Sequence, residues 1–138
     1  MASYLLLLAM LIYVAVGSAI GGVARYLLGG VVQRILDTAF PAGTLLVNVT
    51  GSFLLGAIIR YAFDTHSLSP EIRAFLTIGF CGGYTTFSTF SYEAMALLED
   101  GEWARAGAYI TASVILSLAG TFLGFALARQ LIVWREHV

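Results

Sequence analysis

Long apolar runs separated by short polar ones dominate the pattern of this chain. Four segments are apolar over the roughly 20 residues that a helix needs to cross a bilayer; they are 4–28, 40–63, 72–98 and 104–132. The connections QRILDTA, DTHSLSPE and EDGEW carry seven of the 15 charged residues. Because a single segment can satisfy its own backbone in lipid only as a helix, runs of this length are helical. The pattern predicts an all-α integral membrane protein of one domain with four transmembrane helices.

The third segment contains a polar stretch, Gly79–Ser91, which reads GFCGGYTTFSTFS. Three glycines stand there among six hydroxyl-bearing residues and three phenylalanines. We expect helical structure to fail at Gly82-Gly83, with the third helix broken near Gly82–Thr85. Irregular backbone at membrane depth persists only where protein buries it or where it lines a polar cavity. The stretch therefore predicts a broken helix, other helices packed around it and a polar solute or ion beside it.

Composition excludes several classes of protein. Of 138 residues 59% are hydrophobic and 11% charged, and the mean hydropathy is +0.90. A soluble fold of this size has too little interior to hide so much apolar surface. The net charge of -1 gives no basic footprint for nucleic acid. The sequence has no metal-ligand spacing, phosphate loop or nucleophile beside a plausible base, so we do not expect an enzyme.

Glycines recur at four-residue spacing in three of the predicted helices. The pairs are Gly17 and Gly21, Gly79 and Gly83, and Gly120 and Gly124. Such spacing allows helix backbones to approach closely in lipid. Glycine is common in membrane helices, which could explain one pair, but three pairs favour tight packing.

The arginines give almost no preferred orientation. Cytoplasmic termini would place Arg60, Arg73, Arg129 and Arg135 inside, and Arg25, Arg34 and Arg105 outside. Lysine and arginine asymmetry normally sets topology. Either other signals orient the chain, or it inserts both ways round and forms an antiparallel dimer with two-fold symmetry. Charge alone leaves both readings open.

Several polar or aromatic residues within the spans have a structural and a functional interpretation. Asn48, in the second span, either forms hydrogen bonds between helices or belongs to a functional site. Phe87 and Phe90 share one helix face; they are core packing, or their positive ring edges face an anion. The hydroxyls of Ser88 and Thr89 bond back to the helix or donate to a ligand.

Backbone and charged groups near these residues also have a structural and a functional interpretation. Carbonyls freed between Gly82 and Thr85 suit a hard monovalent cation, unless the break is only a packed kink. Arg25 snorkels to the interface or concentrates anions in a vestibule. Glu93 lies near a helix end and could simply face a water-filled entrance.

The chain resembles the CrcB/Fluc family of fluoride channels along nearly its whole length. The matching motifs are GGVARYLLG at 21–29, GTLLVNVTGSFLLG at 43–56 and GFCGGYTTFSTFSYE at 79–93. The resemblance implies a dual-topology homodimer of antiparallel subunits with two fluoride pores. It also implies a bacterial cytoplasmic (inner) membrane location and passive fluoride efflux that protects the cell.

The resemblance assigns roles residue by residue. Asn48 would hydrogen-bond fluoride or its water, Phe87 and Phe90 would form an aromatic box, and Ser88 and Thr89 would form a polar track. The carbonyls of Gly82 and Thr85 would hold a structural sodium ion at the dimer interface. Arg25 and Glu93 would belong to the vestibule. A looser match suggests further pore-lining positions on the fourth helix, which are Tyr109, Ser113 and Thr121.

Two other functions are compatible with four short helices. A proton-coupled dual-topology transporter needs a membrane-embedded carboxylate, and Glu93 is the only candidate. A non-transporting scaffold subunit would use Asn48 and the phenylalanines only for packing, which leaves the hydroxyl-rich break unexplained. We therefore favour the channel.

Overall fold

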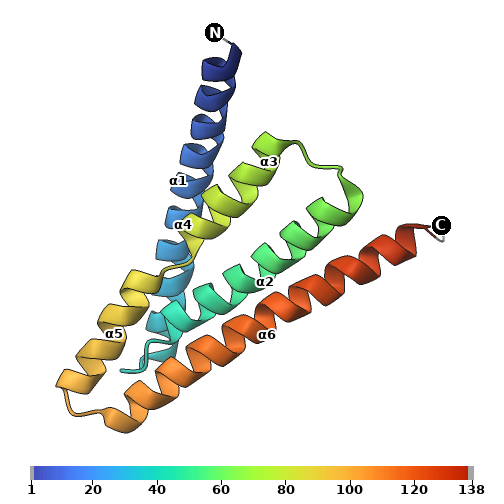
Figure 1. Cartoon of the computed structure of the whole chain (residues 1–138). Helices are drawn as coiled ribbons and strands as arrows, with labels where there is room; N and C mark the ends of the chain where they lie inside the picture. The colour runs from blue at the N-terminus through green and yellow to red at the C-terminus, as the bar shows by residue number, and fades with distance from the viewer. Residues whose placement is uncertain (1, 137–138) are drawn as a thin grey trace.

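The computed structural model describes residues 2–136, which form helices joined by short connections (Figure 1). Three helices are continuous and apolar enough to cross a membrane: α1 (Ala2–Leu36), α2 (Ala42–Thr65) and α6 (Trp103–Glu136). The third predicted span is divided into α3 (Pro70–Ala74), the π-helical segment η1 (Phe75–Cys81), α4 (Gly82–Tyr84) and α5 (Phe87–Glu99). The all-α fold with a broken third helix is confirmed.

The first helix continues past residue 28, where its apolar run was expected to end. It stops at Leu36, so both Arg25 and Arg34 project from helix. Asp37 follows in the left-handed conformation, with φ of 41°, and its N–H still donates to the Gln33 carbonyl. Charge alone did not end this helix, because a single arginine is compatible with helical structure.

The break lies at the C-terminal end of the predicted range Gly82–Thr85. Gly82 and Gly83 are helical, and the chain becomes extended at Thr85 and Thr86. Thr86 is the N-cap of α5, and its Oγ1 accepts a hydrogen bond from the Thr89 N–H. The threonine thus caps the start of α5, one residue after α4 ends at its C-cap, Thr85. The expectation that Gly82-Gly83 would lose helical structure was wrong.

The glycines serve the packing that their spacing predicted. A Cβ added to Gly17 would lie 2.5 Å from the Phe75 carbonyl oxygen, and one added to Gly83 would lie 2.5 Å from that of Ser18. Gly120 and Gly124 meet the α2 backbone at Val49 and Phe53 in the same way. Backbones therefore touch at both the α1–α4 and the α2–α6 crossings, and the predicted close approach is confirmed.

Substituting Gly83 with alanine should destabilise the protein by about 1–3 kcal/mol, the usual cost of overpacking. The new methyl group meets the Ser18 backbone, which cannot move aside as a side chain could. Thermal unfolding in detergent measures the effect. Gly22→Ala is the control, because a Cβ at that position on α1 meets nothing within 4 Å. Equal stability of the two variants would contradict the role assigned to this crossing.

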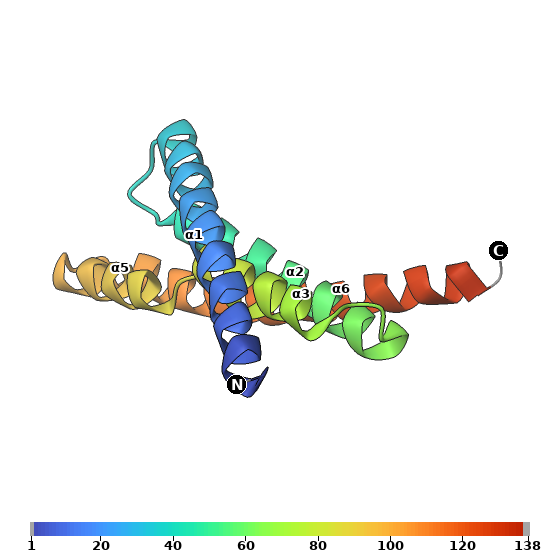
Figure 2. The ribbon, with the colours of Figure 1, turned by 90° about the horizontal axis from the view of Figure 1, so that it is seen from above.

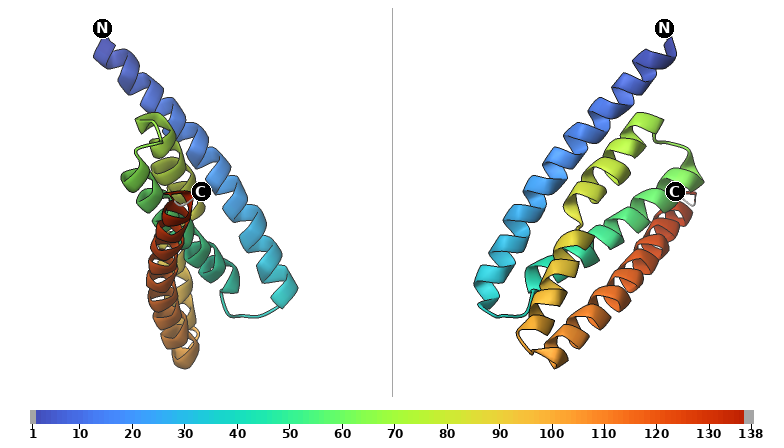
Figure 3. Two further views of the ribbon diagram at one scale, coloured as in Figure 1. Left: turned by 90° about the vertical axis from the view of Figure 1, so that its right-hand side faces the viewer. Right: turned by 60° about the vertical axis from the view of Figure 1, so that its left-hand side comes forward.

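The helices form a layer that α1 crosses. Seen from above, α2, the broken third helix and α6 lie in one band, and α1 runs obliquely across it (Figure 2). The edge-on view shows the same band with α1 slanting over it, and both ends of α1 extend beyond the band (Figure 3). The first turns of α1 carry strongly exposed apolar side chains, Leu5 to Leu8 among them. This surface needs lipid or another protein to cover it.

Candidate ion pathway

The break in the third helix is held open by α2. Asn48 accepts a hydrogen bond from the Thr86 N–H through Oδ1 (2.8 Å) and donates to the Thr86 carbonyl through Nδ2 (3.1 Å). Two residues along α2, the Thr50 hydroxyl lies 2.9 Å from the Tyr84 hydroxyl. Asn48 therefore does act between helices. One of its two amide hydrogens is not used by these bonds and remains available to a ligand.

Beside this pair lies a cavity of about 360 Å³, which we call the Asn48 cavity. Phe87 and Phe90 line it from α5, with ring centroids 5.5 Å apart and planes tilted by 46°. Phe87 is 79% exposed, so its ring also points away from its own chain. The remaining lining comes from the break and from α2 and α6: Gly51, Ser52, Leu55, Thr85, Thr86, Ser113, Val114, Ser117 and Leu118.

Ser113 is a lining residue of this cavity with a buried hydroxyl. Its side chain is only 7% exposed, and its Oγ has no hydrogen-bond partner among residues 2–136. A buried hydroxyl without a partner costs free energy. Ser113 lines the cavity together with an amide and two aromatic rings, so its buried hydroxyl lies at the wall of the space that a solute would enter.

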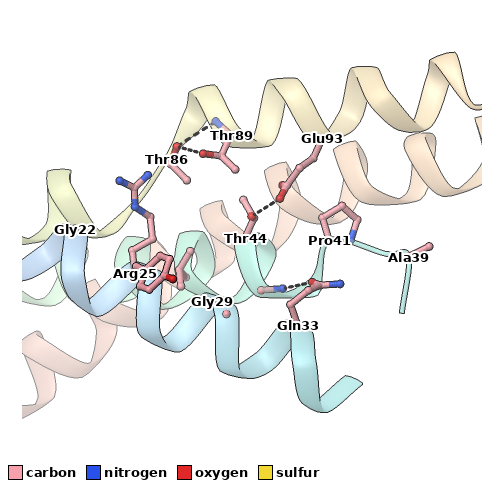
Figure 4. Close-up of a pocket in the computed structure, with 14 residues that line it drawn as sticks. Gly22, Arg25, Gly29, Gln33, Ala39, Pro41, Thr44, Thr86, Thr89 and Glu93 are labelled. Carbon is pink, nitrogen blue, oxygen red and sulfur yellow. Dashed lines mark hydrogen bonds between the residues drawn. The ribbon is translucent and has the colours of Figure 1, made fainter. Parts of the chain in front are cut away.

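A second hollow of about 580 Å³, the Arg25 groove, is lined mainly by residues of α1, α2 and the start of α5 (Figure 4). It contains both residues predicted for a vestibule, Arg25 from α1 and Glu93 from α5. The Glu93 carboxylate accepts hydrogen bonds from the hydroxyls of Thr44 (2.8 Å) and Tyr109 (2.7 Å). Arg25 forms no salt bridge within residues 2–136. Within the described residues, the groove thus contains one cation without a salt bridge and one carboxylate that accepts two hydrogen bonds.

The other predicted pore residues lie around these two hollows. Thr89 lines the Arg25 groove. Ser88 is exposed, with its Oγ 3.3 Å from Thr86 Oγ1. Tyr109 is fully buried between Glu93 and Phe90, and lines neither hollow. The Thr121 hydroxyl bonds to the carbonyls of Ser52 and Ser117 and also lies outside both.

Two backbone carbonyls fit the chemistry of a cation site. In a continuous helix the Thr86 N–H would donate to the Gly82 carbonyl, but here it donates to Asn48. Thr85 is extended, so its carbonyl also leaves the helical pattern. Within the described residues no cluster of three histidine, cysteine or acidic side chains could hold a metal. Carbonyl oxygens released from the helical pattern are ligands that suit a hard cation.

Sequence reasoning missed several lining residues. Ser52 and Ser117 each lie one helical turn after a predicted residue, Asn48 and Ser113 respectively, so the four-residue spacing could have found them. Gln33 was also missed. Its amide donates to the carbonyls of Thr38 and Phe40 and accepts from the Gly43 N–H, which fixes the connection at one end of the Arg25 groove.

Comparison with known proteins identifies the family. The family model described as "CrcB-like protein, Camphor Resistance (CrcB)" matches residues 12–125. The chain belongs to the CrcB family. A curated member from Geobacter sulfurreducens is 56% identical over 118 residues, which cover 86% of this chain and 95% of the relative. Members from Geobacter metallireducens and Rhizobium meliloti are 50% and 48% identical over 88% of this chain and 98% of each relative. All three are named fluoride-specific ion channel FluC.

This CrcB-family membership confirms the resemblance stated from the three motifs. The chain is a multi-pass membrane protein, and its curated relatives are bacterial. Because these relatives are ion channels, the expectation that the chain is not an enzyme is also confirmed.

Proposed function

We propose that this protein is a fluoride-selective channel that lets fluoride leave the bacterial cell passively. The observation that carries the proposal is that Ser113, whose hydroxyl has no hydrogen-bond partner within residues 2–136, lines one cavity with the Asn48 amide and the paired phenylalanines. The relatives named above are fluoride-specific channels, which supports fluoride as the ion.

The chemistry of the cavity suits a small, strongly hydrated anion. Fluoride must receive hydrogen bonds as it sheds water, and amide and hydroxyl groups donate them without a full positive charge that would hold the ion too tightly. The ring edges of Phe87 and Phe90 add a weak positive field. Arg25, unpaired within residues 2–136, would attract anions to the groove.

The working unit we propose is an antiparallel homodimer with two pores. Phe87 is 79% exposed at the rim of the Asn48 cavity, so a second copy can complete the aromatic box. The near balance of arginines suits insertion in both orientations. At the interface, the carbonyls of Gly82 and Thr85 from two copies would hold a structural sodium ion. Sodium would supply positive charge to the freed carbonyls.

Purified protein in liposomes should show fast fluoride efflux when potassium and valinomycin balance the charge. Fluoride and chloride electrodes at fixed pH measure it, with empty liposomes as the control. We expect fluoride flux without a chloride signal and without a proton gradient. Flux that requires an opposing proton gradient would instead support a coupled transporter using Glu93. Folded dimers without any flux would support the scaffold.

A further inference from the structure

The Arg25 groove and the Asn48 cavity meet at one residue. Thr86 lines both, and no other residue between 2 and 136 does so. On both sides of Thr86, consecutive residues line different hollows. Val47 and Thr89 line the groove, and the residues that follow them, Asn48 and Phe90, line the cavity. An ion that moves from one hollow to the other therefore passes Thr86.

Thr86 is held firmly in this position. Its N–H and its carbonyl both bond to the Asn48 side chain, and its Oγ1 accepts from the Thr89 N–H at 3.1 Å. The residue is 8% exposed. Because it is tied to α2 through its backbone and to α5 through its side chain, Thr86 cannot move aside without breaking hydrogen bonds in both directions.

The Thr86 hydroxyl also controls a donor that faces the groove. It donates to Thr89 Oγ1 at 3.0 Å, so the Thr89 oxygen accepts this bond (Figure 4). The proton of Thr89 is then available to donate to an ion, and accepting a bond strengthens a hydroxyl as a donor. Within residues 2–136 the Thr89 hydroxyl has no other hydrogen bond, so the Thr86 hydroxyl is the group that fixes its orientation.

We propose that Thr86 is a specificity-determining residue at the passage between the two hollows. Its γ-methyl group limits the size of the anion that passes, and its hydroxyl orients the Thr89 donor. The proposal rests on the proposed function, since a passage has a role only if an ion crosses it.

Two substitutions separate these roles. Thr86→Ser keeps the hydroxyl and the helix cap but removes the methyl group; we expect chloride efflux to rise above the leak of empty liposomes, and the chloride-to-fluoride ratio to rise with it. Thr86→Val keeps the shape but removes the hydroxyl. We expect fluoride flux to fall about tenfold, as for one lost hydrogen bond to an ion. The half-saturating fluoride concentration should rise, and chloride should remain excluded.

A matched control removes a threonine hydroxyl elsewhere in the same broken helix. The Thr77 hydroxyl donates to the Arg73 carbonyl, and Thr77 lines neither hollow, so Thr77→Val should leave both flux measurements unchanged. Thr86→Val also removes the cap of α5. Loss of folded protein lowers the maximal rate but changes neither the half-saturating concentration nor the chloride-to-fluoride ratio.

The outcomes distinguish this inference from the function on which it rests. If both Thr86 variants keep the ratio and the half-saturating concentration of the unsubstituted protein, Thr86 does not determine specificity. If Thr86→Val does not fold, the chloride signal of Thr86→Ser alone decides the steric part. If the unsubstituted protein passes no fluoride, the proposed function itself fails.

Discussion

Replacing Asn48 with aspartate should lower fluoride flux by about a hundredfold, because about 3 kcal/mol of repulsion from a fixed negative charge is added to the barrier. The carboxylate would face the Asn48 cavity and oppose an entering anion. It would also lose the bond to the Thr86 carbonyl, since an ionised carboxylate cannot donate. Liposome efflux with a fluoride electrode measures the result.

Asn48→Ala is the comparison for this variant. It also loses the two bonds to Thr86 but adds no charge, so its flux should fall less than that of Asn48→Asp. Thermal unfolding of the detergent-solubilised protein checks that both variants are folded. Undiminished flux in folded Asn48→Asp would remove Asn48 from the pathway, and equal losses would show that holding the break is its whole role.

Replacing Phe90 with isoleucine should lower fluoride flux about twofold to tenfold, the effect of losing about 0.5–1.5 kcal/mol of aromatic interaction. Isoleucine keeps most of the apolar bulk but has no ring edge to face an anion. Phe90 also contacts Tyr109, with ring centroids 5.2 Å apart. The same efflux assay applies, with dimer assembly followed by size-exclusion chromatography.

The control for Phe90 is another phenylalanine of the same broken helix. Phe80 stacks on Tyr84 with ring centroids 5.7 Å apart and lines neither hollow. Phe80→Ile should therefore leave flux in assembled dimers unchanged. Unchanged flux in assembled Phe90→Ile as well would show that the aromatic box has no electrostatic role.

The helices could be predicted because lipid leaves the backbone few alternatives. Uninterrupted apolar length was enough to identify α1, α2 and α6. The close helix contacts could also be predicted, because the spacing of the glycines is visible in the sequence. Only a residue without a Cβ permits the contacts that Gly17 and Gly83 make. The helical spans and the glycine contacts depend on one segment and the helix that packs against it. A sequence pattern is sufficient to predict such features.

The break lies within the predicted range, but helical structure was wrongly expected to fail at Gly82-Gly83, because two local effects compete there. Glycine weakens a helix, but Gly83 is needed by α1 in the helical conformation. The threonines that follow can cap a new helix, and Thr86 does so with the help of Asn48 from α2. A partner 38 residues away in sequence decides the position. No local pattern contains that contact.

The candidate site was predicted as a set of residues but not as a geometry. Asn48, Phe87 and Phe90 do line one cavity, and Arg25 and Glu93 do line one groove. Tertiary packing alone separates these hollows and buries Tyr109 away from both. The roles of these residues toward fluoride and sodium remain predictions.

The two-residue extended step at Thr85 and Thr86 has a consequence for the electric field of the protein. It divides one helix into two oppositely facing dipole ends, because the run from Pro70 to Tyr84 finishes in carbonyl groups while α5 starts with N–H groups. The first end is partially negative and the second partially positive. A single interruption of the backbone therefore offers neighbouring sites of opposite polarity, so a cation and an anion could both be bound close together without an additional charged side chain.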